Sequence, residues 1–285
     1  MRLQLFRSLW TNGFDLAAAL RDVATGAFDG VEGPVPAEAS SRREFAIRLA
    51  DARVPFIAEI VTGGDYVPRH SSLEKHFDEF RLQAEAAIPC RPEFITVLAG
   101  CDRWPLDQTL AFLRRALDFC QELGVTACFE THRSRPTFNP WATRELLLRL
   151  PELRLTCDFS HWCCVCERLV LDHEPEILWQ CAAHTGHIHA RVGYEQGPQV
   201  PHPAAPEYLA ALEAHERWWR VLWSAQQSAG HDVVTMTPEF GPDGYLHTSP
   251  FSDEPVASLD EINTWMALRQ RAAFAEFSAT PATVN

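Results

Sequence analysis

Carboxylate and imidazole side chains follow or end four apolar segments in the second half of the chain. Taken in chain order, the polar residues of these segments are Glu130, His132, Asp158, His161, His187, His189, Arg191 and Glu239. Three carboxylates and an imidazole brought together would repel one another and would be costly to bury, and a divalent cation offsets both effects. Such an oxygen-rich set suits Mn²⁺, Mg²⁺ or Co²⁺, and it differs from the thiolate sets of many zinc sites. The sequence therefore predicts a metal site if the fold brings these segments together.

The elements that would position these residues are short β-rich runs separated by helical stretches. Eight such runs occur, at 3–6, 30–32, 56–61, 94–99, 125–130, 153–158, 186–190 and 233–238. Apolar residues recur at three- and four-residue intervals between the runs, as in 73–87, 106–123 and 209–228, which is typical of amphipathic helices. Eight βα units in a chain of this length predict an α/β fold, a (β/α)₈ TIM barrel. The carboxyl ends of its strands would form one face, where the polar residues are expected to meet.

We expect one barrel domain over 1–285, because no linker divides the chain. Ser258 and Glu261 have the spacing of a capping box and predict the start of a closing helix over 258–277. The tail at 278–285 is rich in Thr, Pro and Ala and is expected to fray.

Composition and charge narrow the classes of function. The 285 residues are 46% hydrophobic and 22% charged, as in a globular domain. A formal net charge of −13 disfavours binding to nucleic acid or to an anionic membrane surface. Nine cysteines without a regular framework fit reduced thiols, and no export signal or long apolar run is readable. We therefore expect a cytoplasmic protein that binds a small molecule, and a homo-oligomer is left open.

The polar residues also carry a family resemblance. Glu130, the Asp-x-x-His of 158–161, the His-x-His of 187–189 and Glu239 occur in an order that resembles xylose-isomerase-like TIM barrels, specifically the sugar isomerase/epimerase group. The resemblance covers nearly the whole chain. It implies a single divalent metal ion, with Mn²⁺ as the first expectation and Mg²⁺, Co²⁺ or Zn²⁺ as alternatives. The implied metal ligands are Glu130, Asp158, His189 and Glu239.

The same resemblance implies roles in catalysis. Glu130 and Glu239 would exchange a proton with the substrate from opposite sides, His161 would contact a substrate oxygen, and Arg191 would help to hold the substrate. Some ketose epimerases have a further glutamate one turn after the first, where this chain has Pro136, and His132 is the nearer polar candidate for substrate binding. The activity implied is that of a metal-dependent sugar isomerase or epimerase acting next to a carbonyl.

Three other functions fit parts of the pattern. A dehydratase of the inosose or dehydroshikimate kind would begin with the same proton abstraction and then expel a hydroxyl. A metal-binding barrel without catalysis would return its ligand intact. Apurinic-site endonucleases look similar at Glu130, 158–161 and Glu239, but they carry additional histidines on the early strands. Those histidines are missing here, since the third and fourth runs end in the sequences Thr-Gly-Gly-Asp at 62–65 and Ala-Gly-Cys-Asp at 99–102. The acidic net charge disfavours a nuclease as well.

Weaker features leave alternatives open. The cysteines of 161–166 suggest buried helix-face residues more than a thiolate metal site, because a second C-x-x-C is missing. The segment 191–208 is long for a βα connection and could form a lid. Glu32 and Glu59 could line the pocket, Glu59 could equally pair with an arginine, and the glycines of 62–65 could face an anion. Most tryptophans follow helical spacing, which favours packing roles.

Overall fold

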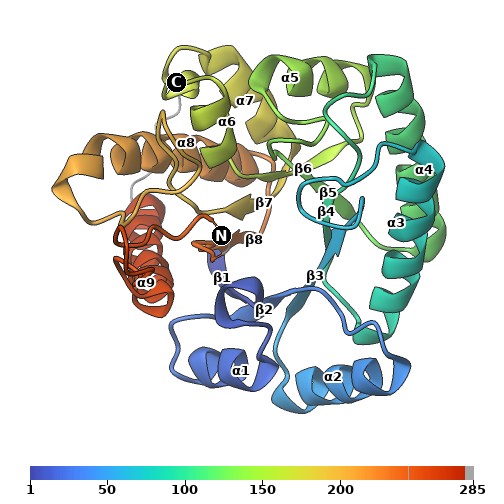
Figure 1. The fold of residues 1–285 in the computed structure, drawn as a ribbon, viewed down its shortest axis with the longest axis horizontal. Coiled ribbons are helices and arrows are strands. Elements are labelled where there is room, and N and C mark those ends of the chain that lie inside the picture. The colour runs from blue at the N-terminus through green and yellow to red at the C-terminus, as the bar shows by residue number, and fades with distance from the viewer. Residues whose placement is uncertain (243, 280–285) are drawn as a thin grey trace.

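A computed structural model of the chain describes residues 1–242 and 244–279. Eight parallel strands close into one barrel in chain order, with β1 paired to both β2 and β8 (Figure 1). The strands are β1 Arg2–Ser8, β2 Gly30–Gly33, β3 Phe56–Val61, β4 Ile95–Leu98, β5 Ala127–Glu130, β6 Arg154–Cys157, β7 Thr185–His189 and β8 Val233–Thr237. The predicted (β/α)₈ barrel is confirmed, and each predicted strand differs from the observed one by at most two residues at either end.

Helices surround the strands and follow them along the chain (Figure 1). They are α1 Leu16–Ala24, α2 Ala39–Ala52, α3 Leu73–Ala87, α4 Leu106–Leu123, α5 Pro140–Arg149, α6 Ser160–Val165, α7 Pro175–His184, α8 Leu209–Ser228 and α9 Leu259–Ala279. Short 3₁₀ turns lie at Trp10–Asn12, Ile88–Cys90, Val170–Asp172 and Pro206–Tyr208. Among the described residues, no helix is both long and apolar enough to cross a membrane.

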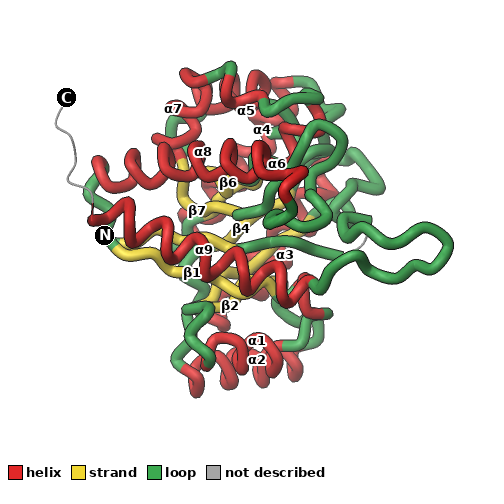
Figure 2. Tube along the Cα trace, turned by 90° about the vertical axis from the view of Figure 1, so that its left-hand side faces the viewer, coloured by secondary structure: helices red, strands yellow, loops and turns green. Residues whose placement is uncertain are grey.

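The closing helix α9 begins as its capping pattern predicts. Ser258 Oγ accepts a hydrogen bond from the Glu261 amide at 3.4 Å, and α9 runs beside β1 and next to α8 (Figure 2). The helix continues through Ala279, so the first two residues of the predicted tail, 278 and 279, are helical. The rest of that predicted tail, 280–285, lies outside the described residues.

Alternation along each strand divides the interior into two layers. In β3, Phe56, Ala58 and Ile60 are buried in the main hydrophobic core. The alternate residues Glu59 and Val61 line a cavity at the carboxyl ends of the strands. This two-residue period is why a single strand contributes both to packing and to a polar site.

Candidate active site

Four side chains with metal-binding chemistry converge at the carboxyl ends of β5 to β8. Glu130 ends β5, Asp158 directly follows β6, His189 ends β7, and Glu239 lies two residues beyond β8. All four are buried. One oxygen or nitrogen atom from each lies within 4.8 Å of those from the other three. The structure thus brings together the four residues that the sequence analysis singled out, and their role as ligands stays a prediction.

The orientation of His189 indicates that this donor set fits a metal ion. Its Nε2 lies 3.0 Å from Glu32 Oε1 in a hydrogen bond. Its Nδ1 lies 2.9 Å from Glu239 Oε2 and 3.6 Å from Glu130 Oε2, yet it makes no aligned hydrogen bond with either. A buried nitrogen surrounded by carboxylate oxygens, with the opposite ring nitrogen fixed by a carboxylate, is the usual arrangement of a metal-binding histidine.

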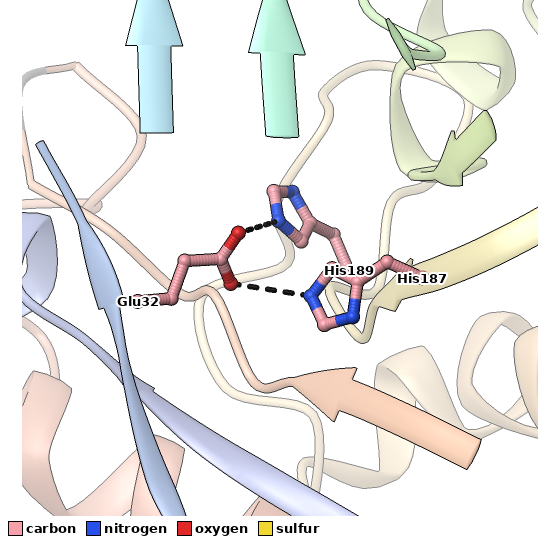
Figure 3. Close-up of side chains that lie close together, drawn as sticks. All are labelled: Glu32, His187 and His189. Carbon is pink, nitrogen blue, oxygen red and sulfur yellow. Dashed lines mark hydrogen bonds and ion pairs between the residues drawn. The ribbon is translucent and has the colours of Figure 1, made fainter. Parts of the chain in front are cut away.

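Glu32 holds the two histidines of β7 in place (Figure 3). Besides His189, it accepts a hydrogen bond from His187 Nε2 at 3.2 Å, and Thr237 donates to the same carboxylate oxygen. Burial raises the pKa of Glu32, but the two histidines outweigh that effect and hold it well below its usual range. Glu32, His187 and His189 could themselves hold a metal ion by their spacing, although their mutual hydrogen bonds already satisfy Glu32.

Burial and mutual repulsion shift the carboxyl groups of the site toward their protonated forms. Burial, with Glu239 and Asp158 nearby, raises the pKa of Glu130 to about 7 despite the opposing effect of His189. Burial also raises the pKa of Asp158, although Arg191 opposes it. Burial lowers the pKa of His189, but Glu239, Glu32 and Glu130 reverse this and raise it well above its usual value. The cluster therefore carries more negative charge than it can stabilise alone, which a bound cation would relieve.

Arg191 connects the predicted ligands to the predicted substrate-binding residues. Its Nη2 donates to Asp158 Oδ2, lies 3.4 Å from Glu239 Oε2, and lies 2.8 Å from His161 Nε2. Because a guanidinium only donates, His161 Nε2 must accept and the proton lies on Nδ1. Burial, followed by nearby positive charges, lowers the pKa of His161 well below its usual value, so the ring is neutral.

The predicted substrate-binding residues differ in their access to the cavity. His132 and Arg191 line it. His161 is fully buried behind them, with its ring centroid 3.9 Å from that of His132, and it is not among the lining residues. His161 Nδ1 is buried and has no hydrogen-bond partner within the described chain.

The cavity has a volume of about 640 Å³ and combines acidic with aromatic walls. Its lining residues are Trp10, Phe14, Pro34, Glu59, Val61, Gly64, Asp65, Tyr66, Gln83, Leu98, Glu130, His132, Arg191, Glu239 and Tyr245. The Tyr245 ring lies 5.4 Å from Trp10 and 6.1 Å from Tyr66, centroid to centroid, and the Arg191 guanidinium lies 4.7 Å from its centre. Gly241 makes this wall possible, since a Cβ there would lie 1.9 Å from the Trp10 ring.

Buried Arg135 positions the loops that border the cavity. Its guanidinium donates to the carbonyl oxygens of Thr62, Asp65, Tyr66 and Gly100, at 2.7 to 3.0 Å. It thereby connects the loop after β5 to the loops after β3 and β4. This role could not be predicted from the sequence, because an isolated arginine in a loop carries no periodic signal.

The structure also places the features that the sequence left open. Beyond Arg191, no residue of the segment 191–208 lines the cavity, and Gln199 instead exchanges two hydrogen bonds with Gly241, so the structure does not support a lid. Cys163 is buried on α6 and all nine cysteines are free thiols. Glu59 lines the cavity and pairs with no arginine in the described chain. The aromatic residues of the cavity were missed, since they lie in loops.

No protein-family model matches the sequence, and no curated protein matches it. Solved structures do match. A xylose isomerase-like TIM barrel protein from Mycobacterium smegmatis in complex with magnesium has a TM-score of 0.61 at 14% identity, over 95% of this chain and 97% of that one. The fold is that of a xylose isomerase-like TIM barrel. The predicted resemblance is therefore confirmed at the level of the fold.

Solved structures of proteins with different activities match comparably well. D-allulose 3-epimerase from Methylomonas sp. in complex with D-allulose has a TM-score of 0.57 at 11% identity, over 95% of this chain and 97% of that one. Endonuclease IV from Thermus thermophilus has a TM-score of 0.59 at 14% identity, over 97% of this chain and 99% of that one. A probable 3-DHS dehydratase from Bacillus anthracis has a TM-score of 0.58 at 13% identity, over 94% of this chain and 98% of that one. At these identities the comparisons show the fold, and function must be argued from the site.

Proposed function

We propose that the protein is a divalent-metal-dependent sugar isomerase or epimerase that moves a proton next to the carbonyl of a small polyhydroxylated substrate. One observation carries the proposal. Of the four clustered residues, Glu130 and Glu239 line the cavity, whereas Asp158 and His189 do not. The two glutamates are therefore the members that can reach both a metal ion and a substrate.

A divalent ion at the predicted site would supply an electrophile. A divalent ion held by Glu130, Asp158, His189 and Glu239, with Mn²⁺ as the first candidate, would stabilise negative charge on a carbonyl oxygen as the C–H bond breaks. A magnesium ion in the Mycobacterium smegmatis barrel agrees with this class of metal, and D-allulose in the Methylomonas epimerase agrees with a sugar substrate.

The residues of the chain would carry the proton. One glutamate would remove the proton from the carbon beside the carbonyl, and the C–H electron pair would move toward the carbonyl oxygen. In epimerisation the other glutamate would return a proton to the same carbon from the opposite side, and the carbonyl would re-form. In isomerisation the proton would go to the former carbonyl carbon, while the proton of the neighbouring hydroxyl would pass to the former carbonyl oxygen. In the metal-free protein, burial raises the pKa of Glu130 to about 7, so this carboxyl can hold or release a proton near neutral pH. Arg191 would donate to a substrate oxygen, and His132 would contact the substrate from the loop after β5. His161, which lies behind these two residues, would donate its unpartnered Nδ1 proton to a substrate oxygen.

A dehydratase is the second candidate. It needs the same proton abstraction and a further group that protonates the departing hydroxyl. Glu59 is another carboxyl in the cavity, with a pKa that burial and neighbouring carboxylates raise to about 8, and it could supply that proton. The fold shared with a probable 3-DHS dehydratase also supports this candidate.

Incubation of Mn²⁺-loaded protein with a panel of ketoses, including D-allulose, in D₂O tests the proposal. An isomerase or epimerase places deuterium on the carbon next to the carbonyl, and the product keeps every hydroxyl. Loss of one water with a new ultraviolet absorbance would favour the dehydratase. A tightly bound sugar recovered intact and without deuterium would contradict both enzymes and indicate a binding barrel.

A further inference from the structure

Glu59 extends into the cavity from the strand that faces the proposed metal site across the barrel. Its neighbours Ala58 and Ile60 are buried in the hydrophobic core, so the alternation of β3 turns Glu59 and Val61 toward the barrel interior. In the β2–β3 register Glu32 pairs with Ile57, two residues before Glu59. Glu59 therefore lies one inward-facing layer closer to the cavity than Glu32 does.

The contacts of Glu59 differ from those of the other carboxyl groups in this region. Glu32 binds two histidines and Thr237, and Asp158 binds Ser160 and Arg191. Glu239 lies within 3.4 Å of both His189 and Arg191. Half-buried Glu59 has no hydrogen bond or ion pair with any residue in the described ranges. A partly desolvated carboxyl without a partner costs free energy, so the fold gains nothing evident from it.

The electrostatic environment of Glu59 is consistent with a carboxyl that binds a ligand. Burial first, and then Glu239, Glu32 and Glu130, raise the pKa of Glu59 to about 8. The lining of the cavity carries four acidic side chains, and Arg191 is its single cation among the described residues. With one cation in its lining, this cavity offers a phosphate group few charged donors, whereas hydroxyl groups can bond to carboxyl oxygens in either protonation state without adding charge.

We propose that Glu59 is a substrate-binding residue that hydrogen-bonds a hydroxyl of an uncharged polyhydroxylated substrate, and that phosphorylated sugars are disfavoured. The proposal rests on the proposed function and adds to it a specificity residue and a substrate class. Arg191 would bind one oxygen of the substrate by donation, and Glu59 would bind a second hydroxyl from β3. The aromatic wall of Trp10 and Tyr245 would cover the C–H surface of the sugar, since aromatic rings contribute apolar contact area.

Turnover of free and phosphorylated ketoses by Glu59 variants tests the proposal. The measurement uses Mn²⁺-loaded wild type, Glu59→Gln, Glu59→Met and the control Glu93→Gln, which alters an exposed carboxyl near the start of β4. The probes are D-fructose, D-allulose and D-fructose 6-phosphate. Turnover of each sugar is measured as its deuterium uptake from D₂O. We expect kcat/KM for the best free sugar to fall about 10- to 100-fold in Glu59→Met, mainly through KM, because a site built for a hydroxyl loses its bond. The Mn²⁺ content should be unchanged, and the control should behave as wild type.

Two results in this assay would overturn the proposal. Wild-type kinetics in Glu59→Met would show that Glu59 does not bind substrate. A higher kcat/KM for D-fructose 6-phosphate than for both free ketoses would show that the substrate class is wrong.

Thermal unfolding of the metal-free variants adds a test that needs no substrate. A carboxyl retained for binding is not needed for stability, so Glu59→Met should unfold at the wild-type temperature or a few degrees higher. A lower unfolding temperature would make Glu59 a structural residue and overturn the proposal. If wild type exchanges no sugar of the panel, the proposed function fails, and this unfolding comparison still decides the assignment of Glu59.

Discussion

Replacement of Glu32 by glutamine probes the support beneath the proposed metal site. The carboxylate accepts hydrogen bonds from His187 Nε2, His189 Nε2 and Thr237. A glutamine of the same shape offers one acceptor and turns its NH₂ group toward at least one donor. It also removes the negative charge that faces His189, while the cavity residues are left in place.

The contacts of Glu32 set the size of the expected effect. Removing one partner from a buried, hydrogen-bonded charge cluster costs about 3–5 kcal/mol. An unfolding entropy of about 2.1 cal/mol/K per residue gives about 0.6 kcal/mol/K for 285 residues, so Tm should fall by about 5–8 °C. Because His189 would lose the partner that fixes its ring, Mn²⁺ affinity should fall by about 10- to 100-fold.

The pH dependence of the loss has a definite sign. The folded pKa of Glu32 lies below its usual 4.5, so the carboxylate contributes stability that is fully present above pH 4.5 and is lost as the pH falls further. The difference in Tm between wild type and Glu32→Gln should therefore be full at pH 7 and should narrow in acid.

Calorimetry of metal-free protein and Mn²⁺ titration of both forms provide the assay, with exposed Glu93→Gln as the matched control. Glu93→Gln should match wild type in both measurements. An unchanged Tm together with unchanged Mn²⁺ affinity in Glu32→Gln would refute the reasoning, because it would mean that the hydrogen bonds to the two histidines do not matter.

Three further predictions follow from the same geometry. Asp158→Ala should lose Mn²⁺ on desalting, whereas His161→Ala should retain it and lose turnover. Elemental analysis measures the Mn²⁺ content of both variants, and deuterium uptake measures the turnover of His161→Ala. Equal retention of Mn²⁺ by Asp158→Ala and wild type would remove Asp158 from the ligand set. Because the pKa of Glu59 rises from 4.5 in the unfolded chain to about 8 in the fold, the metal-free protein should lose stability as the pH increases between those values, and Glu59→Gln should reduce that slope in urea unfolding; an identical slope would contradict this. Arg135→Ala should lower the free energy of unfolding by about 3 kcal/mol, because two buried and two partly buried carbonyl oxygens lose their donor; a wild-type urea midpoint would show that those bonds are dispensable.

Periodic features of the sequence predicted most of the fold. The alternation and length of the eight β-rich runs were sufficient to locate the barrel strands, because a two-residue period with helical stretches between has few alternative structures. The same alternation placed His187 and His189 on one face of β7, and Arg191, two residues beyond the strand, lies close to Glu239. The strand ends placed Asp158 and Glu239 beside His189.

The remaining features of the site depend on contacts between distant loops, which have no period. Tyr245 and Trp10 are separated by most of the chain, and they meet because the loops after β8 and β1 are neighbours in a closed barrel. Arg135 contacts four backbone carbonyls, and carbonyl groups are the same in every sequence. Whether Glu59 pairs with an arginine was undecided from sequence, since that depends on which side chains reach β3.

Deuterium exchange by Glu130→Gln and Glu239→Gln tests the central claim most directly. An amide oxygen can still contact a metal ion, but an amide cannot accept the substrate proton near neutral pH. We therefore predict that both variants keep Mn²⁺ after desalting while deuterium uptake into the substrate falls at least about 100-fold, since positioned acid–base groups contribute about 10²–10⁴ in rate. Near wild-type exchange in both variants, with Mn²⁺ retained, would contradict the assignment of proton transfer to these two glutamates.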